Sequence, residues 1–161
     1  MKKFILLVLT LLFIVLTYSF KPVFAGVVNL HGLVYSNVEY SVYCLNLTEN
    51  LANCTIIKNG NSNVIKTNIN NAKYVKSKVS MVLGESVSFK SFQTSVDKLI
   101  NYFNLKVAKS EKVGDIYCVY GFCENKNFEN SVEIEGQKVN IQIAFNNNRI
   151  TIGTPIILGD Y

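Results

Sequence analysis

The chain has 161 residues, of which 49% are hydrophobic and 17% charged, and its formal net charge is +5 at pH 7. Much of that charge lies near the N-terminus: without Lys2, Lys3 and Lys21, 13 basic residues face 11 acidic ones, a net charge of +2. A balance this even argues against a nucleic-acid partner, because phosphate binding needs a concentrated basic face.

Residues 1–25 have the pattern of a secretory signal peptide. Residues 2–3 are lysines, residues 4–16 are almost wholly apolar, and Val23 and Ala25 place small side chains where a signal peptidase reads them. We therefore expect cleavage after Ala25 and an extracytoplasmic, secreted product.

The remainder, residues 26–161, is predicted to form a single domain. Its 136 residues can bury about two-thirds of their unfolded surface, enough for a core without covalent staples. An uncleaved anchor is the alternative, since residues 4–20 lie at the short limit for crossing a hydrocarbon layer of about 30 Å. Only then would a membrane be a partner, with the domain still outside.

The first elements after this segment are predicted to be strands. Residues 38–44 alternate between apolar and polar positions, which is the period of a half-buried strand. A second strand is expected over residues 54–57, ending at the turn residues Asn59 and Gly60, and a third over residues 64–69.

Residues 72–82 carry apolar side chains at helical spacing. Ala72, Val75, Val79 and Val82 recur at steps of three and four, and Gly84 stands where a helix cap belongs. The β-branched residues leave a strand open as the alternative. Residues 86–89 are then expected to be extended.

The strongest helix pattern covers residues 91–103. Its apolar residues form one stripe, Ser91 is the expected N-cap, and Asn104 can adopt the left-handed conformation that ends a helix. The stripe is interpreted as core, because a helix that also bound a partner would need a second apolar face.

The rest of the chain is predicted to be strand and turn. Strands are expected over residues 116–122, 132–134, 139–145 and 149–158, the last with Pro155 at an edge or at the end of its paired part. Short connections favour antiparallel hairpins, so the sequence predicts an α+β fold with one or two helices on one face of the sheet. The residues expected on the exposed face are Glu133, Glu135, Asn140 and Gln142.

The mature chain has four cysteines, Cys44, Cys54, Cys118 and Cys123, which allow two disulfides in three connectivities. A hairpin would bring the first two together, whereas the last two are five apart and need a bend. Free buried thiols are the alternative. The spacing lacks the paired pattern of a zinc site, and His31 is the only histidine, so neither a metal nor another cofactor is expected.

Four segments of the C-terminal half resemble the YwmB family of exported proteins from endospore-forming low-GC bacteria. They are residues 84–89, 120–122, 139–144 and 152–157, with a terminal Tyr161. The resemblance implies a curved antiparallel sheet backed by helices, a fold likened to that of TATA-box-binding protein. It also implies a link to sporulation or the cell envelope, and it supplies no catalytic residues.

These observations favour an exported, non-catalytic domain that binds a protein or a cell-envelope component. One alternative is a small secreted enzyme, with Cys118 or Cys123 as nucleophile and His31 as base. Another is an inhibitor or immunity protein. An enzyme using two carboxylates would draw them from Glu39, Glu49, Glu85, Glu111, Asp115, Glu124 and Glu129.

Overall fold

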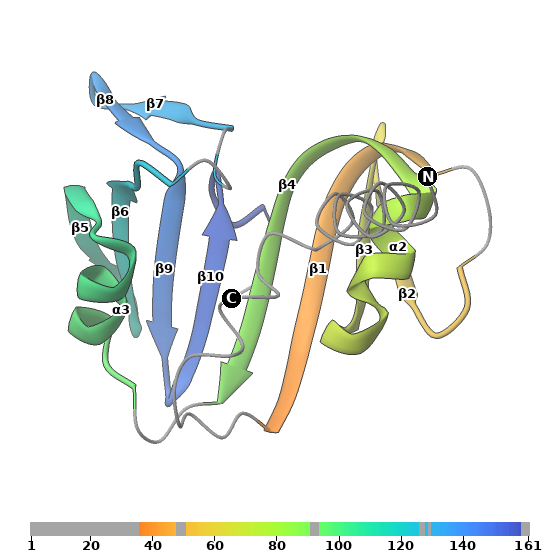
Figure 1. The fold of residues 1–161 in the computed structure, drawn as a ribbon, viewed down its shortest axis with the longest axis horizontal. Helices are drawn as coiled ribbons and strands as arrows, with labels where there is room; N and C mark the ends of the chain where they lie inside the picture. The colour runs from red at the N-terminus through yellow and green to blue at the C-terminus, as the bar shows by residue number, and fades with distance from the viewer. Residues whose placement is uncertain (1–35, 48–50, 91–93, 126–127, 129, 159–161) are drawn as a thin grey trace, which may run out of the picture.

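The computed structural model describes residues 36–158, apart from 48–50, 91–93, 126–127 and 129, so the predicted signal peptide lies outside the described residues. Eight strands form one antiparallel sheet in the order β2-β3-β1-β4-β10-β9-β6-β5, and β7 pairs with β8 separately (Figure 1). The strands are β1 (Ser36–Leu47), β2 (Thr55–Asn59), β3 (Ser62–Asn68), β4 (Val79–Lys90), β5 (Lys106–Val113), β6 (Ile116–Phe122), β7 (Val132–Ile134), β8 (Gln137–Val139), β9 (Ile141–Asn146) and β10 (Arg149–Thr154). The helices are the 3-10 turn η2 (Ile69–Asn71), α2 (Ala72–Lys78) and α3 (Val96–Phe103).

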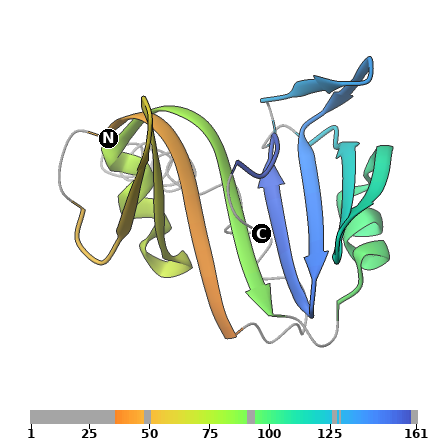
Figure 2. The same ribbon diagram turned by 180° about the vertical axis from the view of Figure 1, so that it is seen from behind.

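Helices α2 and α3 cover the same face of the sheet. Helix α2 lies over the β1–β3 side and α3 over the β5–β6–β9 side, as the front and back views agree (Figures 1 and 2). The predicted α+β class, with helices on one face, is confirmed. The opposite face carries no helix from the described part of the chain.

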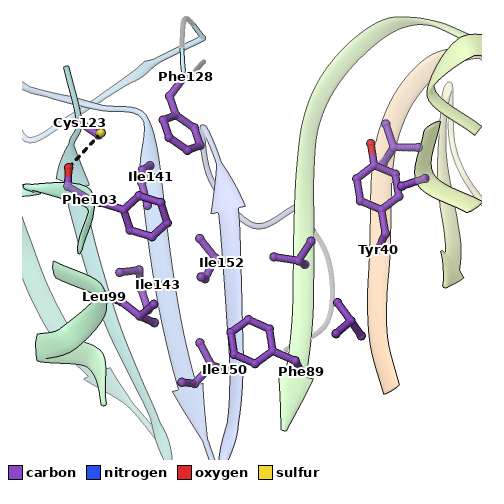
Figure 3. Close-up of a cluster of buried hydrophobic side chains, with 14 of the residues drawn as sticks. Tyr40, Phe89, Leu99, Phe103, Cys123, Phe128, Ile141, Ile143, Ile150 and Ile152 are labelled. Atoms are coloured by element: carbon purple, nitrogen blue, oxygen red, sulfur yellow. Dashed lines mark hydrogen bonds between the residues drawn. The ribbon is translucent and has the colours of Figure 1, made fainter. Parts of the chain in front are cut away.

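The hydrophobic core lies between the sheet and these helices. Leu99 and Phe103 of α3 pack toward Ile141 and Ile143 of β9 (Figure 3), and the Phe103 ring meets Phe128 edge to face at 5.7 Å between centroids. The apolar stripe predicted for this helix is therefore core. The strands contribute alternate residues to the same core, namely Val38, Tyr40, Val42, Cys44, Ile65, Val87, Phe89, Val119, Ile150 and Ile152.

The ends of α3 are set by local capping. The Ser95 side chain accepts a hydrogen bond from the Lys98 N–H, so Ser95 is the N-cap. The predicted cap, Ser91, lies outside the described residues. Asn104 ends the helix with φ 46° and ψ 49°, the left-handed conformation predicted for it.

Only residues 72–78 of the helix predicted over residues 72–82 are helical. Helix α2 ends at Lys78, and the chain continues as the twelve-residue strand β4. Here Val79 lies opposite Leu47 of β1, and Gly84 lies inside the strand instead of capping a helix. Pairing of this β-branched segment with β1 outweighs its weak helical pattern.

Two further features of the sheet differ from the sequence reading. Strand β3 lies between β1 and β2, so the expected hairpin between the strands that bear Cys44 and Cys54 does not form. Strand β5 was not predicted, because its sequence has no clear apolar alternation. Its residues are mostly exposed, since it is an edge strand.

The strand predicted over residues 139–145 is divided at Asn140 into β8 and β9. The Asn140 side chain accepts from the Cys123 N–H and donates to the carbonyls of Cys123 and Phe128, each at 2.8 Å. Asn140 is thus buried, contrary to the expected exposure. Gln142 is buried too, because its Oε1 accepts from the Ile157 N–H at 2.9 Å.

Residues 155–158, called the tail below, fold back over the sheet face opposite the helices. Strand β10 ends at Thr154, so Pro155 falls just past the paired part, one of its two expected positions. Ile157 packs against Cys118 and Ala144 on that face. A Cβ added at Gly153 would lie 2.6 Å from Ile157 Cγ1, so the tail packs directly against this glycine.

Candidate binding surface

Small and polar side chains run across the sheet face opposite the helices. Residues directly opposite one another in antiparallel strands share a face, so the strand register shows which of them lie together. One rung crosses all eight strands through Thr55, Lys66, Ser41, Ser86, Gly153, Gln142, Tyr120 and Lys109. The next rung runs through Asn68, Glu39, Ser88, Thr151, Ala144, Cys118 and Glu111.

A hydrogen-bonded network occupies the middle of this face. Arg149 Nε donates to Ser88 Oγ at 2.6 Å, and the Ser88 and Thr151 hydroxyls are 2.9 Å apart. Arg149 Nη2 also lies 3.7 Å from Glu39 Oε1. These four residues, called the polar band below, tie together β1, β4 and β10. Both charged side chains remain more than one-third exposed, so a ligand can reach them.

A pocket of about 500 Å³ opens beside the polar band, at the edge of the sheet. It forms because the β2–β3 pairing begins at Thr55 and Lys66, which leaves Thr67 and Asn68 without a β2 partner. The Thr67 hydroxyl donates to the Asn53 carbonyl at 2.9 Å and holds the adjoining turn in place. The lining residues of this edge pocket are Val38, Glu39, Asn53, Cys54, Thr55, Lys66, Thr67 and Asn68.

The edge pocket and the polar band form one continuous surface, because Glu39 belongs to both. The pocket offers one carboxylate, one ammonium group, two amides and two hydroxyls. Such a set can donate and accept hydrogen bonds and can bind groups of either charge. These groups suit recognition of a polar ligand, and the network on this surface contains no histidine.

Glu85 lies on the other face of the sheet, away from Arg149, and is held in a buried cluster. Its Oε2 accepts from the Tyr40 hydroxyl at 2.7 Å, and its Oε1 lies 2.6 Å from Lys76 Nζ. Burial, followed by the Glu85 charge and hydrogen bond, raises the pKa of Tyr40 well above its usual range. Both carboxylate oxygens are occupied, so Glu85 fastens α2 to the sheet.

All four cysteines are free thiols in this structure. Cys118 packs under the tail against Ala144, whereas Cys123 Sγ donates to the Phe103 carbonyl at 3.1 Å on the helix side (Figure 3). Cys44 is buried in the core, which raises its pKa, and Cys54 is the partly exposed one. Disulfide formation in an oxidising compartment stays a prediction.

The remaining candidate carboxylates that the structure describes are Glu111, Asp115 and Glu124. Glu111 accepts from the Tyr120 hydroxyl at 2.9 Å and lies 3.2 Å from Lys109, and its pKa is lowered by these two bonds. Glu124 pairs with Lys106 at 2.5 Å, and Asp115 is exposed in a turn. Within the described residues, no three His, Cys, Asp or Glu side chains gather as a metal site.

Three of the candidate catalytic residues, His31, Glu49 and Glu129, lie outside the described residues. The pairing of a cysteine with His31 is therefore untested.

The chain has no match among protein-family models, curated proteins or solved structures. The resemblance to the YwmB family and the likeness to TATA-box-binding protein therefore stay predictions from the sequence. Among the described residues, no helix is both long enough and apolar enough to span a bilayer.

Proposed function

We propose that this chain is an exported, non-catalytic domain that binds a protein or a cell-envelope component through the edge pocket and the polar band. The observation that carries the proposal is the continuity of these two features through Glu39. A pocket next to an accessible charged network gives a ligand both a cavity and anchoring charges.

The surface suits binding better than chemistry. The Ser88 hydroxyl bonds to Thr151 and to Arg149, and Glu39, the carboxylate of the polar band, pairs with Arg149. Arg149 and Glu39 instead present a fixed cation and a fixed anion. Paired charges of this kind give specificity toward a ligand with complementary groups.

Export rests on the pattern of residues 1–25, and the link to sporulation or the envelope rests on the resemblance to the YwmB family. The glycines of the matched segments have packing reasons to be glycine. A Cβ would lie 2.5 Å from Leu105 Cγ at Gly121 and 3.0 Å from the Thr154 carbonyl oxygen at Gly84. Any protein with this packing needs glycine at these positions. The presence of these glycines in the matched segments is therefore compatible with a shared fold.

The ligand-binding part of the proposal is tested with isolated cell envelopes. We expect residues 26–161 to co-sediment with envelopes, and Lys66→Glu to weaken this binding about ten-fold by placing an anion in the edge pocket. Lys112→Glu, the same charge change on the far edge strand β5, is the matched control and should bind as the unmodified protein does. Equal binding by the two variants would refute a role for the edge pocket.

A further inference from the structure

The eight-stranded sheet ends at β2 on one side and at β5 on the other (Figure 1). Among the residues that the structure describes, no strand pairs with the outer side of either. An edge strand directs the N–H and C=O groups of every second residue outward, where they can bond to a further strand. Backbone groups at this spacing are complementary to another extended polypeptide.

Strand β5 carries features that discourage the addition of a strand. A bulge after Val107 interrupts its register with β6, and the strand contains the lysines Lys106, Lys109 and Lys112. Proteins use bulges and lysines to keep edge strands from pairing with other chains. The ammonium groups of Lys106 and Lys109 are also held in ion pairs with glutamates of neighbouring segments. The β5 edge is therefore protected.

Strand β2 has no bulge and no proline. Its five residues, Thr55–Asn59, pair with β3 in an unbroken register, and nearly all of them are exposed. Ile56 and Ile57 are β-branched residues that favour strands. Lys58 is the only charged residue of the strand, and within the described residues it forms no ion pair. The β2 edge is therefore the accessible one.

The charge around β2 favours an acidic partner. Residues 51–84, which include β2, β3 and α2, contain five lysines and neither aspartate nor glutamate, a net charge of +5. Only Lys76 among these lysines is shown in an ion pair, with Glu85, which follows this segment. A second copy of the chain would bring the same positive charge to the edge, so like charge disfavours the pairing of two β2 strands.

The two faces of β2 are suited to different side chains. Lys58 lies level with Cys44 of the core, so its side chain is on the face that α2 covers. Ile57, which is 44% exposed, points to the opposite face. An added strand would place alternate side chains beside these two residues. An acidic residue complements Lys58 and an apolar residue complements Ile57.

We propose that the outer edge of β2 binds an extended segment of a partner protein in which acidic and apolar residues alternate. Main-chain hydrogen bonds supply the affinity of such strand addition, and the alternate side chains supply the specificity. This interaction goes beyond the proposed function and does not rest on it. It uses the backbone of β2 and the Lys58 charge, whereas the proposed function uses the charges of the edge pocket and the polar band.

The test is calorimetric titration of residues 26–161 with two synthetic peptides of equal length and blocked ends, one of repeated Val-Glu and one of repeated Val-Lys. We expect the acidic peptide to bind about ten-fold more tightly than the basic one, and added salt to weaken its binding. Amide hydrogen exchange in the complex should slow at β2 and stay unchanged at β5. Lys58→Glu should weaken binding of the acidic peptide about ten-fold.

Lys112→Glu is the matched control, because it makes the same charge change at an exposed position of the β5 edge. It should bind as the unmodified protein does, and circular dichroism checks that both variants are folded. Equal binding of the two peptides, protection of β5 instead of β2, equal loss in the control, or a dimer that forms through β2 would each overturn the proposal. The edge pocket is tested separately, with envelopes and Lys66→Glu, so failure of either proposal leaves the other standing.

Discussion

The Tyr40 hydroxyl donates a 2.7 Å hydrogen bond to Glu85, and Lys76 occupies the other oxygen of the same carboxylate. Tyr40 is fully buried and Glu85 is 4% exposed, so water cannot readily replace either partner of the bond that joins β1 to β4. Sequence reasoning placed Glu85 among seven carboxylates from which an enzyme would draw a catalytic pair. Its partners instead assign it a structural role.

Loss of the Glu85 carboxylate should therefore be costly. We expect Glu85→Ala to lower the free energy of unfolding by about 3 kcal/mol, because it leaves the Tyr40 hydroxyl without its acceptor and Lys76 without its counter-ion. Glu124→Ala removes the exposed ion pair with Lys106, which solvent screens, and should cost far less stability. Urea denaturation of both variants checks this difference, and equal losses would contradict the assigned role.

The same cluster predicts loss of stability at alkaline pH. Tyrosine in the unfolded chain ionises near pH 10, whereas burial raises the pKa of Tyr40 in the folded protein. The contribution of Tyr40 to the free energy of unfolding is thus complete below pH 10. It declines as the pH rises above 10, because only the unfolded state then releases the hydroxyl proton. Tyr40→Phe should flatten this decline in thermal melts between pH 9 and pH 11, and an unchanged slope would count against it.

Gly153 is predicted to be intolerant of any side chain. An alanine there would place its Cβ 2.6 Å from Ile157 Cγ1 and 2.8 Å from the Ile157 nitrogen, against backbone that cannot move aside freely. We expect Gly153→Ala to destabilise the protein by about 1–3 kcal/mol. It should also release the tail from Cys118, so the Cys118 thiol becomes faster to alkylate. A variant that melts at the same temperature with Cys118 still protected would refute this packing.

At Met81, in contrast, we expect a substitution by glycine to stabilise the protein. Glycine adopts a φ of 53° without steric cost, and the Met81 side chain is largely exposed, so little packing is lost. Met81→Gly should therefore raise the free energy of unfolding by about 0.5–1 kcal/mol. A fall in the melting temperature would show that the left-handed conformation is unstrained at this position.

The thiols can be counted in folded and denatured protein. Cys54 is partly exposed, whereas Cys44, Cys118 and Cys123 are buried, so one thiol should react rapidly with an alkylating reagent in the folded protein. All four should react in denaturant. Fewer than four reactive thiols in the denatured, unreduced protein would establish a disulfide and decide between the two alternatives that the sequence leaves open.

Periodicity predicted most elements of this fold. Alternation located β1 and the region of β9, and the stripe ending at Phe103 located α3, because alternate strand residues and one helix face enter the hydrophobic core. Periodicity located α2 but failed for residues 79–82, where valines at helical spacing also suit a strand. The choice there depends on pairing with β1, which is a non-local property.

The candidate surface was much harder to predict. Glu39 was one of seven candidate carboxylates, and Lys66 was not singled out. The strand order β2-β3-β1 brings the two residues to one pocket, and local sequence patterns do not predict strand order. The expected exposure of Asn140 and Gln142 was wrong for a related reason. Their burial depends on the loop at Phe128 and on the tail, both distant in sequence.

The central claim is that ligand binding depends on the surface shared by the edge pocket and the polar band. Its most direct measurement is the envelope affinity of residues 26–161 carrying Glu39→Lys, beside Glu133→Lys as the control on the separate β7–β8 ribbon. The account predicts about ten-fold weaker binding for the first variant and unchanged binding for the second. Equal affinities in the two variants would contradict it.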